Sequence, residues 1–420
     1  MSETSPKAQS KALELPPLSL YIHIPWCVQK CPYCDFNSHA IKQGIPEQEY
    51  ISHLIADLEQ DLAYVQGREL RSIFIGGGTP SVFSSAGIAQ ILAAVATRIA
   101  FSPSIEITME ANPGTVEAER FAGYVNAGVT RFSIGVQSFA GDQLTRLGRI
   151  HNTDEAVRAA QLAQQLLAQH LQQMTTNTNI PPSSTAAIGA LQPQKIGLQS
   201  FNLDLMHGLP QQSLANAMAD LQQAIDLAPP HISWYQLTIE PNTVFASKPP
   251  ALPEDELLWD IQEQGHALLQ AAGYQQYETS AYSKEGYQCQ HNLNYWRFGD
   301  YLGIGCGAHG KVTLAAEQQI VRTVKVKHPK GYMDLTRNYL DSVQAIAAED
   351  LAFEFFMNRF RLLEACPKAD FTAYTGLPIE SVTPVLARAC ELGLVTETLE
   401  SWQITPHGVR YLNELLQLFL

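Results

Sequence analysis

Three cysteines lie on one short segment near the start of the chain, at Cys27, Cys31 and Cys34. With this Cys-x3-Cys-x2-Cys spacing, three thiolates can hold three irons of a [4Fe-4S] cluster and leave the fourth iron open to another ligand. A structural zinc site takes four protein ligands, so zinc would need His23 or His39 to complete a Cys3His set. The spacing therefore favours an iron–sulfur cluster, with zinc as the alternative.

Composition and charge argue against several classes of protein. The 420 residues, 45% of them hydrophobic, suffice for more than one domain core. The net charge of −14 opposes phosphate-backbone binding, so no nucleic-acid partner is expected. The most basic segment, 322–330, alternates charge with valine and predicts a strand with one solvated face. Because no apolar run approaches the roughly 20 residues that span a bilayer and no signal-peptide pattern is present, we expect a cytoplasmic protein, with peripheral membrane association left open.

Strand and helix patterns alternate six times from residue 18 onward. Short apolar segments bounded by Gly, Pro or polar residues predict the strands, and apolar residues at i, i+3, i+4 and i+7 predict the helices. Such alternation implies a parallel sheet with right-handed crossovers. Six units predict an α/β fold, a partial (β/α)6 barrel over residues 18–272, with a doubly wound open sheet as the alternative. The predicted strands are Leu18–Ile24, Ser72–Gly76, Ile105–Met109, Arg131–Val136, Phe201–Met206 and Ile232–Ile239.

Four regions flank or interrupt the predicted barrel. Residues 1–17 are expected to form a flexible arm, and the uncharged stretch 169–195 a flexible insertion. Residues 273–345 are expected to form a linking α+β region. Residues 346–420 predict a winged-helix-like domain, whose few basic residues favour a lid or docking role over DNA binding. Its predicted helices cover residues 353–362, 379–392 and 406–418, with a hairpin before the last.

Polar and glycine residues stand where the predicted strands end, at the edge that carries the chemistry in barrel enzymes. The segment 76–80 after the second strand contains three glycines, which let backbone amides approach a ligand closely. Glu110 and Gln137 follow the third and fourth strands, and Asp204 lies in the fifth. One such residue is commonly a helix cap or a buried structural contact. Several at successive strand ends predict a binding site.

The cysteine motif, with Tyr33 directly before the third cysteine, resembles that of the radical S-adenosylmethionine (SAM) superfamily. The resemblance implies a [4Fe-4S] cluster on the three cysteines, SAM bound to the open iron, and an electron donor such as flavodoxin or ferredoxin. In the coproporphyrinogen-oxidase-like branch of that superfamily, the matching positions imply SAM contacts. These positions are Tyr21, Tyr33, Gly77, Gly78, Thr79, Glu110, Gln137, Arg149 and Asp204.

A histidine with aromatic neighbours lies in the linking region, where His291, Tyr295 and Trp296 form a His-Asn-x2-Tyr-Trp motif. From spacing alone, such a histidine is more often a hydrogen-bonded core residue, although an imidazole beside flat apolar side chains also suits haem. The motif resembles the one associated with haem binding in HemW-type haem chaperones. The resemblance implies that these three residues contact haem.

Phe36 occupies the position where oxygen-independent coproporphyrinogen III oxidases typically carry a further cysteine. The resemblance to HemW-type proteins therefore implies a chaperone that binds haem as cargo and passes it to an acceptor haemoprotein, a class that includes membrane-bound respiratory complexes. The alternatives are the oxidase itself, which decarboxylates propionate side chains by radical chemistry, and a radical SAM enzyme with an unrelated substrate. No catalytic residue is assigned. Cleavage of SAM, the mode of haem attachment and a homodimer are left open.

Overall fold

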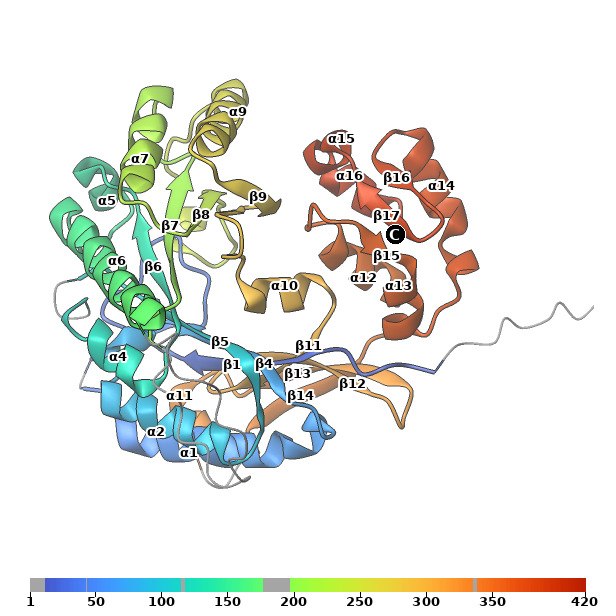
Figure 1. The fold of residues 1–420 in the computed structure, drawn as a ribbon, viewed down its shortest axis with the longest axis horizontal. Helices are drawn as coiled ribbons and strands as arrows, with labels where there is room; N and C mark the ends of the chain where they lie inside the picture. Colours follow the sequence, from blue (N-terminus) through green and yellow to red (C-terminus); the bar gives the residue numbers. More distant parts are fainter. Residues whose placement is uncertain (1–11, 43, 115–117, 177–196, 335–337) are drawn as a thin grey trace, which may run out of the picture.

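The computed structural model describes residues 12–42, 44–114, 118–176, 197–334 and 338–420. Six parallel strands form the centre of its main sheet, in the predicted order (Figure 1). This arrangement confirms the predicted partial barrel, and each predicted strand coincides with an observed one. The last is shorter than predicted, because the chain leaves the sheet after Gln236. The strands are β1 (Leu18–Ile24), β4 (Leu70–Gly77), β5 (Phe101–Ala111), β6 (Arg131–Gln137), β7 (Ser200–His207) and β8 (His231–Gln236).

Strands from residues 275–345 extend this sheet at both edges, so the described sheet has 12 strands and does not close. Next to β8 lie two antiparallel strands, β10 (Ala281–Ser283) and β9 (Gln275–Glu278). At the other edge β11 (Asp300–Ile304) pairs parallel with β1. Three antiparallel strands follow it: β12 (His309–Leu314), β13 (Gln319–Lys325) and β14 (Leu340–Ala345).

Helices cover the outer face of the sheet, whereas one short helix, α10 (Gln290–Trp296), lies across its inner face (Figure 1). The outer helices bury an apolar stripe against the strands, as α1 does with Tyr50, Leu54 and Leu58. The outer set includes α1 (Glu47–Asp61), α2 (Ser85–Ala96), α4 (Phe121–Ala127), α5 (Gly141–Arg146), α6 (Thr153–Thr176), α7 (Leu214–Asp226) and α9 (Asp255–Ala271).

Two segments predicted to be flexible are partly ordered. Helix α6 continues to Thr176, so residues 169–176 of the predicted insertion are helical, and the remainder lies outside the described residues. In the predicted arm, residues 1–11 also lie outside them. Leu13, however, is buried in the core of the C-terminal domain, and the backbone N–H of Glu14 donates to the Ala373 carbonyl at 2.8 Å. Burial of Leu13 removes apolar surface from water and holds this part of the arm in place.

The C-terminal part of the chain has its own core of aromatic side chains, including Phe356, Phe371 and Trp402. A three-stranded sheet and short helices surround this core, and the predicted hairpin is β16–β17. The predicted helix 379–392 is a 3-10 turn followed by α14, and the final helix is interrupted at Tyr411. The elements are α12 (Leu351–Arg359), β15 (Cys366–Pro367), α13 (Lys368–Thr375), α14 (Thr383–Glu391), β16 (Val395–Glu397), β17 (Ser401–Ile404), α15 (Pro406–Arg410) and α16 (Leu412–Gln417).

The basic segment 322–330 was predicted to be a strand, and only its first four residues belong to one, the end of β13; the prediction of one solvated face is wrong for Lys325. The Lys325 side chain is fully buried, and its Nζ lies 2.5 Å from Asp57 Oδ1 and 2.8 Å from Asp61 Oδ2. The two acids are four residues apart on α1, so they face the strand together. Their charges compensate the buried ammonium, which could not otherwise leave water.

None of the described helices has both the length and the apolar content to cross a membrane.

Candidate functional site

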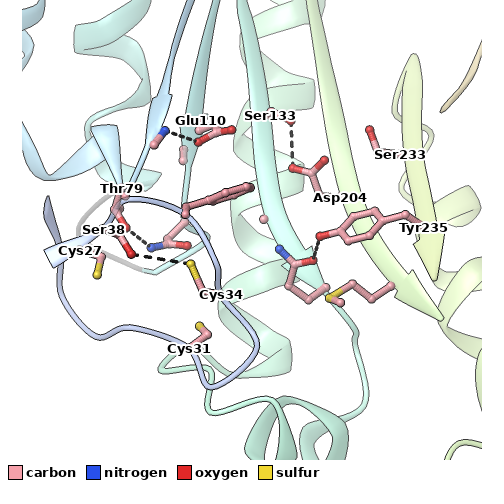
Figure 2. A pocket seen from close by; sticks show the side chains of 18 of the residues that line it. Cys27, Cys31, Cys34, Ser38, Thr79, Glu110, Ser133, Asp204, Ser233 and Tyr235 are labelled. Atoms are coloured by element: carbon pink, nitrogen blue, oxygen red, sulfur yellow. Dashed lines mark hydrogen bonds between the residues drawn. The ribbon is translucent and has the colours of Figure 1, made fainter. Parts of the chain in front are cut away.

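The three cysteines lie on a loop whose two ends are joined by backbone hydrogen bonds. Cys27 ends β2 (Trp26–Cys27), which pairs with β3 (His39–Ala40). The Cys34 N–H donates to the Cys31 carbonyl at 3.1 Å, which forms a turn between those two residues. All three thiols are free and line one cavity of about 560 Å³ above the C-terminal ends of the parallel strands (Figure 2).

The two histidines that could complete a zinc site are engaged elsewhere. His23 Nδ1 lies 2.9 Å from the Tyr21 hydroxyl, and His23 Nε2 lies 2.9 Å from the Asn37 carbonyl. His39 Nε2 lies 3.4 Å from the Lys327 carbonyl. Among the residues that the structure describes, no three His, Cys, Asp or Glu side chains group as ligands of one metal ion. His23 and His39 therefore both have polar partners other than the three cysteines.

Two glycines at the end of β4 form a wall of this cavity that no other residue could form. Gly77 has φ +117°, and a Cβ there would lie 2.7 Å from the His23 ring. A Cβ on Gly78 would lie 2.4 Å from the Trp26 carbonyl oxygen. Such distances are shorter than a carbon atom tolerates, and positive φ is strained for residues other than glycine. The cysteine loop and the end of β4 therefore approach each other backbone to backbone.

Two partly buried carboxylates face this cavity, Glu110 from β5 and Asp204 from β7, with β6 between those strands (Figure 2). Glu110 Oε2 accepts the Gly77 N–H at 3.0 Å, and burial together with the nearby Asp204 charge raises the pKa of Glu110 to about 8. Asp204 accepts from Ser133 Oγ at 2.9 Å and from Asn202 Nδ2 at 2.7 Å. Burial raises the pKa of Asp204 to about 6, although these hydrogen bonds oppose the rise. A ligand with a cationic group or hydroxyl donors would stabilise both ionised forms.

Arg149 brings a positive charge beside the cysteines. Its Nη2 donates to Asn112 Oδ1 and to the Gly135 carbonyl, both at 2.7 Å, and its Nη1 lies 3.6 Å from Cys31 Sγ. Asn112 Nδ2 in turn donates to Thr79 Oγ1 at 3.1 Å. The buried Arg149 Nε has no hydrogen-bond partner among the described residues. A guanidinium with an unused donor suits a carboxylate ligand.

Of the remaining predicted SAM residues, Gln137 and Tyr33 line the first cavity and Tyr21 does not. Gln137, which adopts φ +68° at the end of β6, accepts a hydrogen bond from the Tyr235 hydroxyl at 2.7 Å. Tyr33 lines the same cavity and packs on Phe245, with ring centroids 6.3 Å apart. Tyr21 does not line this cavity but a second one beside it. The structure thus gathers eight of the nine predicted positions around the cysteines.

Several polar residues of the first cavity were missed from the sequence. They occupy alternate positions of a strand, so their side chains point to the inner face together with those that were predicted. Polar residues at every second position of otherwise apolar strands were the available signal. The missed residues are Asn112 directly after β5, Arg131 and Ser133 on β6, Asn202 on β7, and His231, Ser233 and Tyr235 on β8.

A second cavity, of about 730 Å³, adjoins the first and shares Cys34 and Phe36 with it. His291 and Tyr295 of α10 line this second cavity, whereas Trp296 does not. The Trp296 ring instead packs against the Arg361 guanidinium, whose Cζ lies 5.1 Å from the ring centroid. His291 Nδ1 lies 3.3 Å from Ser72 Oγ, and burial lowers the His291 pKa to about 4. The cavity thus offers a neutral imidazole and aromatic walls.

Comparisons with known proteins agree with this architecture. The Radical SAM superfamily model matches residues 21–181, and the HemN C-terminal domain model matches residues 346–411. A heme chaperone HemW from Escherichia coli is 59% identical over 408 residues, which are 97% of this chain and 99% of that protein. The chain belongs to the HemW family. Its relatives include a heme chaperone HemW of Haemophilus influenzae, 59% identical over 97% of this chain and 99% of that protein, and one of Bacillus subtilis, 31% identical over 96% and 99%.

A solved structure shares the fold of this HemW-family chain. Coproporphyrinogen III oxidase (HemN) from Escherichia coli, described as a radical SAM enzyme, superposes with a TM-score of 0.74. The superposition covers 96% of this chain and 90% of that chain at 20% identity. Membership of the radical SAM superfamily implies a [4Fe-4S] cluster and SAM. Three free thiols on one cavity, with partly buried carboxylates and an incompletely paired guanidinium beside them, fit both groups.

Proposed function

We propose that this protein is a haem chaperone, which binds haem and transfers it to an acceptor haemoprotein. The observation that carries this proposal is the second cavity, which adjoins the predicted cluster site and is lined by histidines and aromatic rings. A haem site needs a nitrogen ligand for iron and flat apolar walls for the macrocycle. The names of the HemW relatives support the same function.

We propose that Cys27, Cys31 and Cys34 hold the cluster and that the first cavity holds SAM. When bound there, the cluster would supply an electron, and SAM would be the ligand of the iron that no cysteine holds. Arg149 suits the SAM carboxylate, and Glu110 suits its ammonium group, because each offers the opposite charge in a buried place. The predicted contacts from Tyr21, Tyr33, Gly77, Gly78, Thr79, Gln137 and Asp204 are part of this proposal.

The oxidase alternative is not favoured. Phe36 stands where that enzyme typically has a further cysteine, and its side chain is 58% exposed and lines both cavities. An exposed phenyl ring between the two cavities offers apolar surface to a macrocycle. We propose that His291 and Tyr295 contact haem directly. Trp296, which contacts Arg361, would position α10 against the C-terminal domain.

The proposed partners follow from the cargo. The acceptor is a haemoprotein, a class that includes membrane-bound respiratory complexes, and the electron donor is a flavodoxin or ferredoxin. The protein would work in the cytoplasm and dock on membrane-bound acceptors from there. The C-terminal domain suits a docking role because its helix α12 contacts α10, which forms part of the wall of the second cavity.

The test is an anaerobic haem titration of the cluster-loaded protein, followed by transfer to an apo-haemoprotein. Saturation near one haem per chain at low micromolar concentration or below, with weaker binding by His291→Ala, is expected. Transfer should depend on the cluster, so Cys27→Ala should bind haem and fail to deliver it. Weak and nonsaturating binding by the unmodified protein would refute the proposal. Turnover of coproporphyrinogen with stoichiometric 5'-deoxyadenosine would instead identify an oxidase.

A further inference from the structure

Four histidines line the second cavity, and they differ in how their imidazole nitrogens are used. They are His23, His39, His291 and His309. The cavity volume of about 730 Å³ lies within the range of roughly 300–1,000 Å³ of cofactor sites. Only a neutral imidazole with a nitrogen that other groups leave free can bind iron. The hydrogen bonds around each ring therefore indicate which histidine can serve as a ligand.

Two of the four are committed to the protein itself. His23 is buried, with one ring nitrogen 2.9 Å from the Tyr21 hydroxyl and the other 2.9 Å from the Asn37 carbonyl. His39 lies 3.4 Å from the Lys327 carbonyl through Nε2. Its ring also meets that of His328 edge-on, with centroids 5.5 Å apart. Binding iron at His23 would break an existing hydrogen bond, and binding it at His39 would have to accommodate the His328 ring against that imidazole.

His291 is built into the wall of the cavity. Its Nδ1 contacts Ser72 Oγ at 3.3 Å, and its backbone N–H donates to Glu106 Oε1 at 3.3 Å. The ring packs on Phe74, with centroids 4.9 Å apart and an interplanar angle of 31°. These contacts hold the imidazole in a fixed, tilted orientation against a neighbouring aromatic ring. This geometry suits packing against the face of a macrocycle.

His309 differs from the other three. It is exposed at the start of β12, and neither of its ring nitrogens hydrogen-bonds to a residue that the structure describes. Its backbone is nevertheless fixed, since it pairs with Val324 and passes so close to Gly303 that a Cβ there would lie 2.0 Å from the His309 carbonyl oxygen. Partial desolvation of the ring and the charges of Lys327 and Arg322 lower the His309 pKa, which favours the neutral imidazole.

We propose that the second cavity is the haem site and that His309 supplies the nitrogen ligand to the haem iron. In this arrangement His291 and Tyr295 pack against the macrocycle, and the exposed Lys327 pairs with a propionate. The inference rests on the proposed function and names the ligand within it. An exposed ligand suits a carrier, because the nitrogen–iron bond can be exchanged for an acceptor's ligand without opening the core.

The experiment compares full-length, cluster-loaded variants titrated with ferric haem under anaerobic conditions. Affinity is followed by absorbance, and iron ligation by electron paramagnetic resonance. His309→Ala should bind haem at least tenfold more weakly with an altered ligation spectrum, which added imidazole restores. His291→Ala should weaken binding but keep the original ligation spectrum. His407→Ala, at an exposed histidine of the C-terminal domain, is the matched control and should behave like the unmodified protein.

His309→Gln is measured in parallel, and the iron content of the cluster reports whether each variant is folded. Lys327→Gln should weaken binding several-fold without changing the ligation spectrum. Unchanged affinity and ligation in both His309 variants would overturn the inference, as would loss of the ligation spectrum in His291→Ala alone. Absence of saturable haem binding by the unmodified protein is a different outcome, because it would refute the proposed function itself.

Discussion

Replacement of Lys325 by methionine should destabilise the protein strongly, although the residue lies in a segment that looks solvent-exposed in sequence. The substitution keeps the apolar stem and removes the charge that compensates Asp57 and Asp61. All three side chains are at most 2% exposed, so two carboxylates would stay buried without a counter-charge. Breaking a buried pair in this way costs about 3 to 5 kcal/mol, or about two to four orders of magnitude in the folded-to-unfolded ratio.

The loss should depend on pH in a direction that can be worked out. Burial raises the pKa of Asp57 and raises that of Asp61 to about 6, while Lys325 opposes both shifts. Without Lys325 both values rise further above those of the unfolded chain. The folded variant then binds more protons than its unfolded form, so its stability increases as the pH falls through the raised values. The deficit of Lys325→Met should therefore shrink between about pH 8 and about pH 5.

The assay is urea unfolding of the anaerobic protein followed by far-ultraviolet circular dichroism at several pH values. Arg388→Met is the matched control, because its 2.9 Å pair with Glu391 is exposed and should contribute less than about 1 kcal/mol. Equal midpoints for the two variants would refute the reasoning. A deficit of Lys325→Met that does not change with pH would show that packing, and not uncompensated charge, causes the loss.

Three further predictions concern the first cavity. Gly78→Ala should lose SAM binding in equilibrium dialysis and keep the iron of the cluster, because the new Cβ would lie 2.4 Å from the Trp26 carbonyl oxygen. The control is Gly141→Ala, which should bind SAM normally because its Cβ would meet no atom closer than 4.0 Å. SAM affinity should rise between about pH 6.5 and about pH 8.5, as Glu110 with its pKa of about 8 ionises, and Glu110→Gln should abolish that rise; a pH-independent affinity of the unmodified protein would contradict this role. Cys27→Ala should lose the iron and sulfide of the cluster, whereas Cys366→Ala, at a buried cysteine of the C-terminal core, should keep both; equal iron contents would contradict the ligand assignment.

Much of the barrel could be predicted because its patterns are local. Each central strand is a short apolar segment between turn residues, and the outer helices show an apolar stripe that recurs every three to four residues. The positions of Glu110, Gln137 and Asp204 at strand ends followed from the same patterns, since parallel strands carry their C-terminal ends to one edge. Predicting that Ser133 and Asn202 also face the site would have required the alternation of side chains along each strand to be considered.

Other features depended on residues far apart in the chain. Leu13 looked mobile among polar and proline residues, but its burial depends on an aromatic core more than 300 residues away. The end of a helix or of an insertion, such as Thr176, depends on packing partners that no local pattern contains. Neighbouring residues alone carry no information about such contacts.

The sequence by itself determined the spacing of three thiols, the order of six strands and the motif around His291, because each depends on residues close together in the chain. Only the tertiary structure decided how the charges and imidazoles are used. Lys325 of β13 is buried because Asp57 of α1, 268 positions away in the chain, accepts a hydrogen bond from its ammonium group. His23 is occupied by Asn37 while His309 stays open, although the sequence presents both as isolated histidines. Burial and hydrogen bonding set the reactivity of a side chain, and both come from contacts that only folding creates.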